Sequence, residues 1–102
     1  MKYGLKEQII DAIRLVFQKF PQIESAILYG SRAKGNYRYN SDIDITLKGD
    51  ELNVDELFKI ENNLDDLLLA YKIDLSIYQQ ISNQALLDQI DLNGVLFYKK
   101  KS

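Results

Sequence analysis

Two short segments in which apolar and polar residues alternate constrain the fold of this chain more than any other feature. In 42–48, Asp42 and Asp44 alternate with apolar residues, and in 73–78 Asp74 does the same. Alternation with period two is typical of a strand that buries one face. A helical pattern of nearly twenty residues lies between the two segments. Because such a crossover joins parallel neighbours, we expect these strands to be parallel if they are adjacent in one sheet.

The remaining patterns predict an α/β (α+β) domain. Apolar residues at helical spacing alternate along the chain with runs of strand-forming residues. We expect a single domain over 1–102, with a mixed sheet of three to four strands and helices packed mainly on one face. The expected elements are helices over 5–20, 53–71 and 82–92 (the last capped by Ser82), a helical turn over 31–35 capped by Ser31, and strands over 23–29, 42–48, 73–78 and 95–98.

Composition narrows the classes of function. The chain has no cysteine and no histidine, which excludes a thiol nucleophile and the commonest general base and metal ligand. Its net charge of -2 argues against direct nucleic-acid binding, which needs a basic face for phosphates. No apolar run reaches the length of a membrane span, and the first residues lack the apolar stretch of a signal peptide. We therefore expect a cytoplasmic protein without membrane contact.

Acidic residues and a Gly-Ser pair are expected to converge at one end of the sheet. If the second and third strands are parallel neighbours, Asp42, Asp44 and Asp74 share a face and an end. The shorter connection between the first and second strands favours an antiparallel pairing. Gly30 and Ser31, which follow the first strand, then meet the three carboxylates.

This cluster has the composition of a metal-dependent phosphate-transfer site. Carboxylates at positions i and i+2 of a strand are about 6.5 Å apart and repel each other unless a cation lies between them. Oxygen ligands favour Mg²⁺, with Mn²⁺ as the alternative. Gly30 lets an anion approach the backbone, the turn at Ser31 can donate to phosphate, and Arg32 and Lys34 can neutralise its charge. Phosphoryl or nucleotidyl transfer, with metal ions clamping the attacking and leaving oxygens, is the chemistry that this set predicts.

The pattern Gly30-Ser31, ten residues, Asp42-x-Asp44, with a later carboxylate, resembles the signature of the DNA polymerase β-like nucleotidyltransferase superfamily. The small domain resembles its minimal nucleotidyltransferase (MNT) branch. The resemblance implies that Gly30 and Ser31 hold the triphosphate of ATP. It also implies that Asp42 and Asp44 bind two Mg²⁺ ions. Asp74 would be a third metal-site carboxylate, which helps to activate the attacking hydroxyl.

The same resemblance implies a partner. Members of the MNT branch are often encoded beside a HEPN-domain RNase toxin, and the branch resembles an antitoxin that transfers AMP to a tyrosine of that toxin. Two alternatives stay open. One is a catalytically silent module that neutralises a HEPN partner by contact, and the other is nucleotidyl transfer to a small molecule such as an aminoglycoside. Either a homo-oligomer or a hetero-oligomer is compatible with these hypotheses of function.

Two further features are less specific. Tyr37 and Tyr39 lie in a polar segment, where aromatic rings can stack on a base or contact a partner. The simpler interpretation is a surface loop. Three consecutive lysines at 99–101 are interpreted as a solvated tail.

Overall fold

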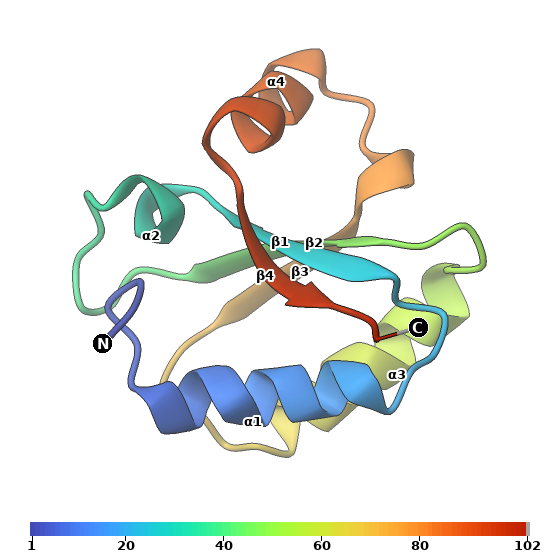
Figure 1. Cartoon of the computed structure of the whole chain (residues 1–102), viewed down its shortest axis with the longest axis horizontal. Helices are drawn as coiled ribbons and strands as arrows, with labels where there is room; N and C mark the ends of the chain where they lie inside the picture. The colour runs from blue at the N-terminus through green and yellow to red at the C-terminus, as the bar shows by residue number, and fades with distance from the viewer. Residues whose placement is uncertain (102) are drawn as a thin grey trace.

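A four-stranded mixed sheet forms the centre of the structure, a computed structural model that describes residues 1–101 (Figure 1). The strands lie in the order β3-β2-β1-β4, with β1 antiparallel to both neighbours and β2 parallel to β3. The predicted fold class and the predicted parallel and antiparallel pairings are therefore confirmed. The strands are β1 (Ser25–Tyr29), β2 (Ile43–Lys48), β3 (Ile73–Ile77) and β4 (Val95–Lys99).

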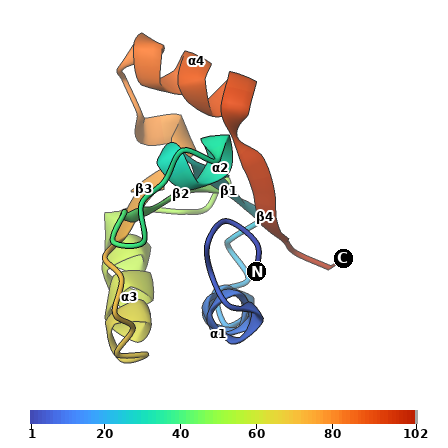
Figure 2. The same ribbon diagram turned by 90° about the vertical axis from the view of Figure 1, so that its left-hand side faces the viewer.

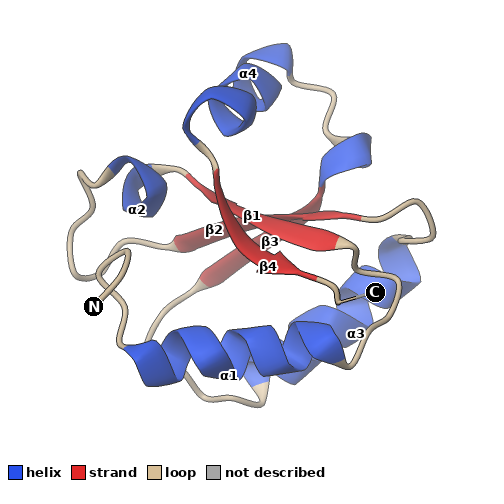
Figure 3. Cartoon of the chain, viewed as in Figure 1, coloured by secondary structure: helices blue, strands red, loops and turns tan. Residues whose placement is uncertain are grey.

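Two long helices, α1 (Glu7–Gln18) and α3 (Val54–Asp65), cover one face of this sheet. They lie side by side beneath it in Figures 1 and 2, and their apolar sides meet the apolar faces of the strands. α4 lies above the opposite face, and α2 is a single turn at the end of β1 (Figure 3). The helices are α1 (Glu7–Gln18), α2 (Ser31–Lys34), α3 (Val54–Asp65), the 3₁₀ turn η1 (Tyr78–Gln80) and α4 (Gln84–Asn93).

The core lies between the sheet and the α1–α3 layer. Apolar side chains of both helices pack there against the alternate residues of β2 that point away from Asp44. Burial of this face fixes which side of each strand stays polar, because side chains alternate between the two faces. Within residues 1–101, no helix is both long and apolar enough to cross a membrane.

The helix after β2 is shorter than predicted. The sequence pattern indicated 53–71, but α3 ends at Asp65. Leu68 adopts a left-handed backbone with φ of 54° and is 89% exposed, so the chain has already left the helix there. Three consecutive leucines at 67–69 made the pattern look continuous. Such a run carries no helical period and therefore does not show where a helix stops.

Both predicted serine caps are wrong by one residue. Gly30 occupies the N-cap of α2, and Ser31 is its first helical residue. For α4 the cap is Asn83, whose Oδ1 accepts a hydrogen bond from the Leu86 backbone N–H at 3.2 Å. Ser82 and Asn83 are both good capping residues, so the sequence alone does not choose between them.

Replacing the observed cap will cost more than replacing the predicted one. Asn83→Ala leaves an N–H of the first turn of α4 without its side-chain acceptor, and we expect it to lower the free energy of unfolding by about 1 kcal/mol. Ser82→Ala is the matched control, with an expected change within about 0.5 kcal/mol. Urea denaturation of both variants measures the difference, and equal losses would contradict the assignment.

Candidate functional site

Three carboxylates lie at the end of the sheet where β2 and β3 begin. The parallel register places Asp44 opposite Asp74, on strands about 4.8 Å apart. Asp42 immediately precedes β2, two residues before Asp44, and lies on the same side of the strand. Asp42 and Asp74 are exposed, whereas Asp44 is half-buried. The structure thus brings these residues to one face, and their roles as metal ligands stay predictions.

The crowding of negative charge is visible in the pKa of Asp44. Partial burial raises the pKa of this carboxyl above its ordinary value, and the charges of Asp74 and Asp42 raise it further. The Arg32 guanidinium acts in the opposite direction with a smaller effect. These carboxylates repel one another, and a cation among them would relieve the repulsion.

The donor set suits a hard divalent cation. All three side chains offer only oxygen, which Mg²⁺ and Mn²⁺ prefer. In their present arrangement, no three His, Cys, Asp or Glu side chains within residues 1–101 lie close enough together to hold an ion. The chemistry of the ligands therefore fits Mg²⁺, which one or two carboxylates commonly hold together with water and substrate phosphate oxygens.

Gly30 brings the backbone against this cluster. β1 runs antiparallel to β2 with Tyr29 opposite Asp44, so the next residue reaches the carboxylates. Gly30 has φ of 77° and ψ of -155°, a conformation open essentially only to glycine. A Cβ at this position would overlap Oδ2 of Asp44. The absence of a side chain is what allows the two segments to meet.

The turn that follows Gly30 begins beside the same carboxylates. α2 begins at Ser31, which is half-buried, and the first N–H groups of a helix have no carbonyl of their own helix to bond. Such N–H groups are suitable donors to phosphate oxygens. Lys34 is exposed at the end of this turn, where its ammonium can move freely. Contact of these residues with a triphosphate stays a prediction.

Arg32 occupies a different place from the one that its assignment to phosphate suggested. It is only 1% exposed, and its guanidinium is directed inward. Nη1 donates to the carbonyl of Tyr3 at 2.9 Å, and Nη2 donates to those of Tyr39 at 3.2 Å and Ser41 at 2.9 Å. Nε also donates to Ser41, at 3.1 Å. Contact between this guanidinium and a phosphate would require breaking these bonds, because the buried group already donates to backbone carbonyls.

Two aromatic rings pack against the same guanidinium of Arg32. Its carbon lies 5.3 Å from the centroid of Tyr37 and 5.0 Å from that of Tyr71. Arg32 thus ties the N-terminal turn, the loop before β2 and the segment before β3 into one unit, which we call the Arg32 clamp. Sequence reasoning missed it, since an arginine beside a Gly-Ser turn looks like a phosphate ligand. Tyr39 is 87% exposed, as expected for a surface loop.

A group of hydroxyls lies on the same sheet face behind the carboxylates. Ser76 Oγ donates to Thr46 Oγ1 at 2.9 Å, linking β3 to β2. Tyr29 is buried, and burial raises the pKa of its hydroxyl, against a smaller lowering by Ser76. The charges of Asp74 and Asp44 raise that pKa as well. Tyr29 therefore stays neutral beside the carboxylates, a neighbour that strand alternation alone did not single out.

The model of one protein family, "Polymerase beta, Nucleotidyltransferase", matches residues 11–102 of the chain. The chain belongs to this polymerase β nucleotidyltransferase family. Family and fold together assign it to nucleotidyl transfer in general. No curated protein sequence matches it.

Solved structures share the fold. A crystal structure of a toxin-antitoxin with AMP-PNP aligns with a TM-score of 0.70 at 22% identity, over 95% of this chain and 76% of that chain. A chain of the complex between tri-AMPylated Shewanella oneidensis HEPN toxin and MNT antitoxin aligns with a TM-score of 0.68 at 17% identity, over 94% and 74%. A protein from Sulfolobus solfataricus described as a nucleotidyltransferase aligns with a TM-score of 0.59 at 25% identity, over 98% and 90%. At such identities the two toxin-antitoxin likenesses establish the fold alone.

Adding a methyl group at Gly30 should be more damaging than at Gly35. Both glycines have a positive φ, but a Cβ at Gly35 meets nothing within 4 Å, whereas one at Gly30 overlaps Asp44. We expect Gly35→Ala to cost about 1 kcal/mol of stability from backbone strain, and Gly30→Ala about 2 kcal/mol or more. Urea denaturation compares them, and similar losses would show that the contact with Asp44 is unimportant.

Neutralising Asp44 should stabilise the protein. A raised pKa means that the acid form favours folding, so this contribution is present at low pH and is lost as the pH rises through the folded pKa of Asp44. We therefore expect Asp44→Asn to raise the melting temperature at pH 7 by about 2–4 °C, a gain that shrinks at acidic pH.

The exposed Asp11 on α1 gives a control for this prediction, and Asp11→Asn should leave the melting temperature almost unchanged. Added Mg²⁺ should raise the melting temperature of the wild-type protein more than that of Asp44→Asn. A lower melting temperature for Asp44→Asn at neutral pH would mean that its carboxylate is stabilised in the fold, contrary to the repulsion argument.

Proposed function

We propose that this protein is an Mg²⁺-dependent adenylyltransferase that transfers AMP from ATP to a tyrosine hydroxyl of a HEPN-domain toxin, and so acts as an antitoxin. The observation that carries the proposal is the meeting of Asp44 and Asp74 with Gly30 at one end of the sheet. Family membership supports nucleotidyl transfer. The fold likeness to a chain of the complex between an MNT antitoxin and a tri-AMPylated HEPN toxin supports transfer of AMP to a toxin of this kind.

In the proposed reaction, the residues at the carboxylate end of the sheet bind the triphosphate or the metal ion. Gly30, Ser31 and the first N–H groups of α2 bind the triphosphate, and Lys34 adds charge compensation. Asp42 and Asp44 would hold Mg²⁺ with the help of Asp74. When bound there, Mg²⁺ neutralises the developing charge on the phosphate oxygens and the leaving group.

Proton transfer is the remaining task. The tyrosine oxygen of the partner forms a bond to the α-phosphorus of ATP while the bond to pyrophosphate breaks. The Asp74 carboxylate accepts the proton of the attacking hydroxyl, as a general base within reach of the exposed edge. Because Asp74 and Asp42 are exposed, the acceptor can arrive on a macromolecule rather than in a closed pocket.

Transfer of label is the direct test. We expect ATP labelled at its α-phosphate to label a HEPN-domain protein encoded beside this gene when Mg²⁺ is present. Asp42→Asn combined with Asp44→Asn should reduce the rate by about 100-fold or more, the scale on which removal of a transition-state charge contact acts. Asp11→Asn should retain the wild-type rate.

Neutralisation of the toxin separates the alternatives. If the double Asn variant, folded and bound to its partner, still abolishes toxicity, the chain acts by contact and the proposal is wrong. Labelling of an aminoglycoside in the absence of any protein partner would instead favour a small-molecule acceptor. Chelation of Mg²⁺ should stop labelling without dissociating the partner, which distinguishes catalysis from binding.

A further inference from the structure

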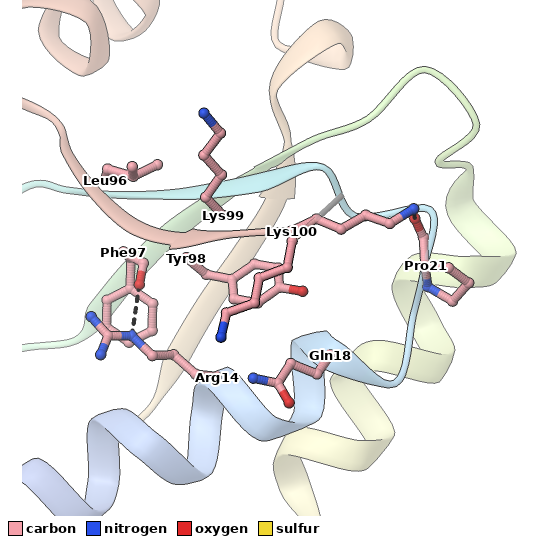
Figure 4. Close-up of a pocket in the computed structure, with 9 residues that line it drawn as sticks. Arg14, Gln18, Pro21, Leu96, Phe97, Tyr98, Lys99 and Lys100 are labelled. Carbon is pink, nitrogen blue, oxygen red and sulfur yellow. Dashed lines mark hydrogen bonds between the residues drawn. The ribbon is translucent and has the colours of Figure 1, made fainter.

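A basic groove lies between α1 and β4, away from the candidate site (Figure 4). Its volume is about 630 Å³, within the range of ligand-binding pockets. Four of its nine lining residues are cations and none is acidic, although the whole chain carries a net charge of -2. The four cations are Arg14, Lys99, Lys100 and Lys101.

Arg14 is held in place by the fold. The register between β1 and β4 shifts at Phe97, which is left without a partner on β1. The carbonyl of Phe97 accepts a hydrogen bond from Arg14 Nε at 2.8 Å, and the guanidinium carbon lies 5.4 Å from the centroid of the Phe97 ring. Within residues 1–101, no hydrogen bond engages the two Nη groups of Arg14. They form a preorganised fork of the kind that binds a carboxylate in bidentate fashion.

The segment after β4 is anchored along the other wall of the groove. The backbone N–H of Lys100 donates to the carbonyl of Glu24 at 2.9 Å, and its Nζ donates to that of Pro21 at 3.0 Å. Figure 4 shows this side chain extended toward Pro21. The interpretation of 99–101 as a tail is therefore wrong for Lys99, which ends β4, and for Lys100, which is exposed but anchored. The anchor holds the backbone of Lys100 against the start of β1, whereas the Lys99 side chain extends from β4 away from Arg14 in Figure 4.

We propose that this groove docks an acidic peptide segment of a partner protein. A carboxylate of the peptide would bind the Arg14 fork, and an apolar side chain would pack against Pro21 at the other end of the groove. A polynucleotide fits less well, because its affinity grows with the number of phosphates neutralised. Here two of only four cations, Arg14 and Lys100, already donate hydrogen bonds to backbone carbonyls.

The position of the groove allows both ends of the sheet to be occupied together. Lys99 pairs with Ser25 at the start of β1, whereas Tyr29 at its end lies beside the carboxylates. Four residues of extended strand separate these positions by about 13 Å. A docked segment would therefore leave Asp44 accessible. The charge of the groove does not depend on the proposed function, so the two proposals can fail separately.

Titration of the isotope-labelled full chain, followed by NMR, tests this site without any catalysis. The probe is an eight-residue peptide of alternating glutamate and leucine, added to millimolar concentration. We expect shifts at the Arg14 side-chain N–H and at the amides of 96–100, and none at Gly30. Arg14→Gln should weaken binding about tenfold, the loss expected for one charged hydrogen-bonding partner.

Substitutions of exposed side chains test the groove without the risk that the variant fails to fold. Lys99→Glu combined with Lys101→Glu changes only exposed side chains and should also weaken binding, whereas Lys59→Glu on α3 should not. The proposal is overturned if the peptide shifts nothing, if its shifts lie at Gly30, or if oligouridine binds the groove more tightly than the peptide. Peptide binding in a protein that fails to adenylylate its partner would uphold the groove and reject the enzyme.

Discussion

The register between β2 and β3 is the constraint on which the candidate site depends. One face of each strand must be buried against the α1–α3 layer, and this requirement excludes every register that turns the apolar residues of one strand away from the core. The observed pairing forces Asp44 and Asp74 to share the opposite face. A slip of either strand by one residue would bury the carboxylate of that strand, at a cost far greater than the repulsion between the two on the surface. The core thus supports a charge cluster that is unfavourable by itself.

The Arg32 clamp supplies the second layer of organisation. A buried guanidinium is costly unless its N–H groups are bonded, and here three backbone carbonyls from two distant segments satisfy it. Each carbonyl belongs to an irregular segment that no sheet or helix holds. The clamp therefore fixes the loop that delivers Asp42, and its positive charge opposes the repulsion felt by Asp44. In this structure Arg32 acts on the site through its hydrogen bonds and its charge, and its contact with phosphate stays a prediction.

The sequence predicts this architecture where burial dictates a period and fails where a single residue decides. Alternation in 42–48 and 73–78 correctly predicted the shared face of the carboxylates, because the strand period is two. The end of α3 was missed, since it depends on the backbone of Leu68. The roles of Arg32 and Lys100 could not be predicted either. Their partners are backbone carbonyl groups. Every residue carries such a group, so no sequence pattern identifies the ones that are bonded.

Charge is distributed unevenly along the sheet. The end that carries Asp42, Asp44 and Asp74 is acidic and would attract a cation, whereas the groove beside Arg14 is lined by four cations and by no acidic residue. An approaching protein with an acidic segment is repelled by the carboxylates and attracted by the cations of the groove. Long-range electrostatics therefore favours one orientation of encounter. A bound cation would weaken the repulsion at the acidic end and so ease the approach of a hydroxyl to it. If both proposals hold, the groove would orient the partner, and the acidic end would accept its hydroxyl only after a cation had compensated the charge of the carboxylates.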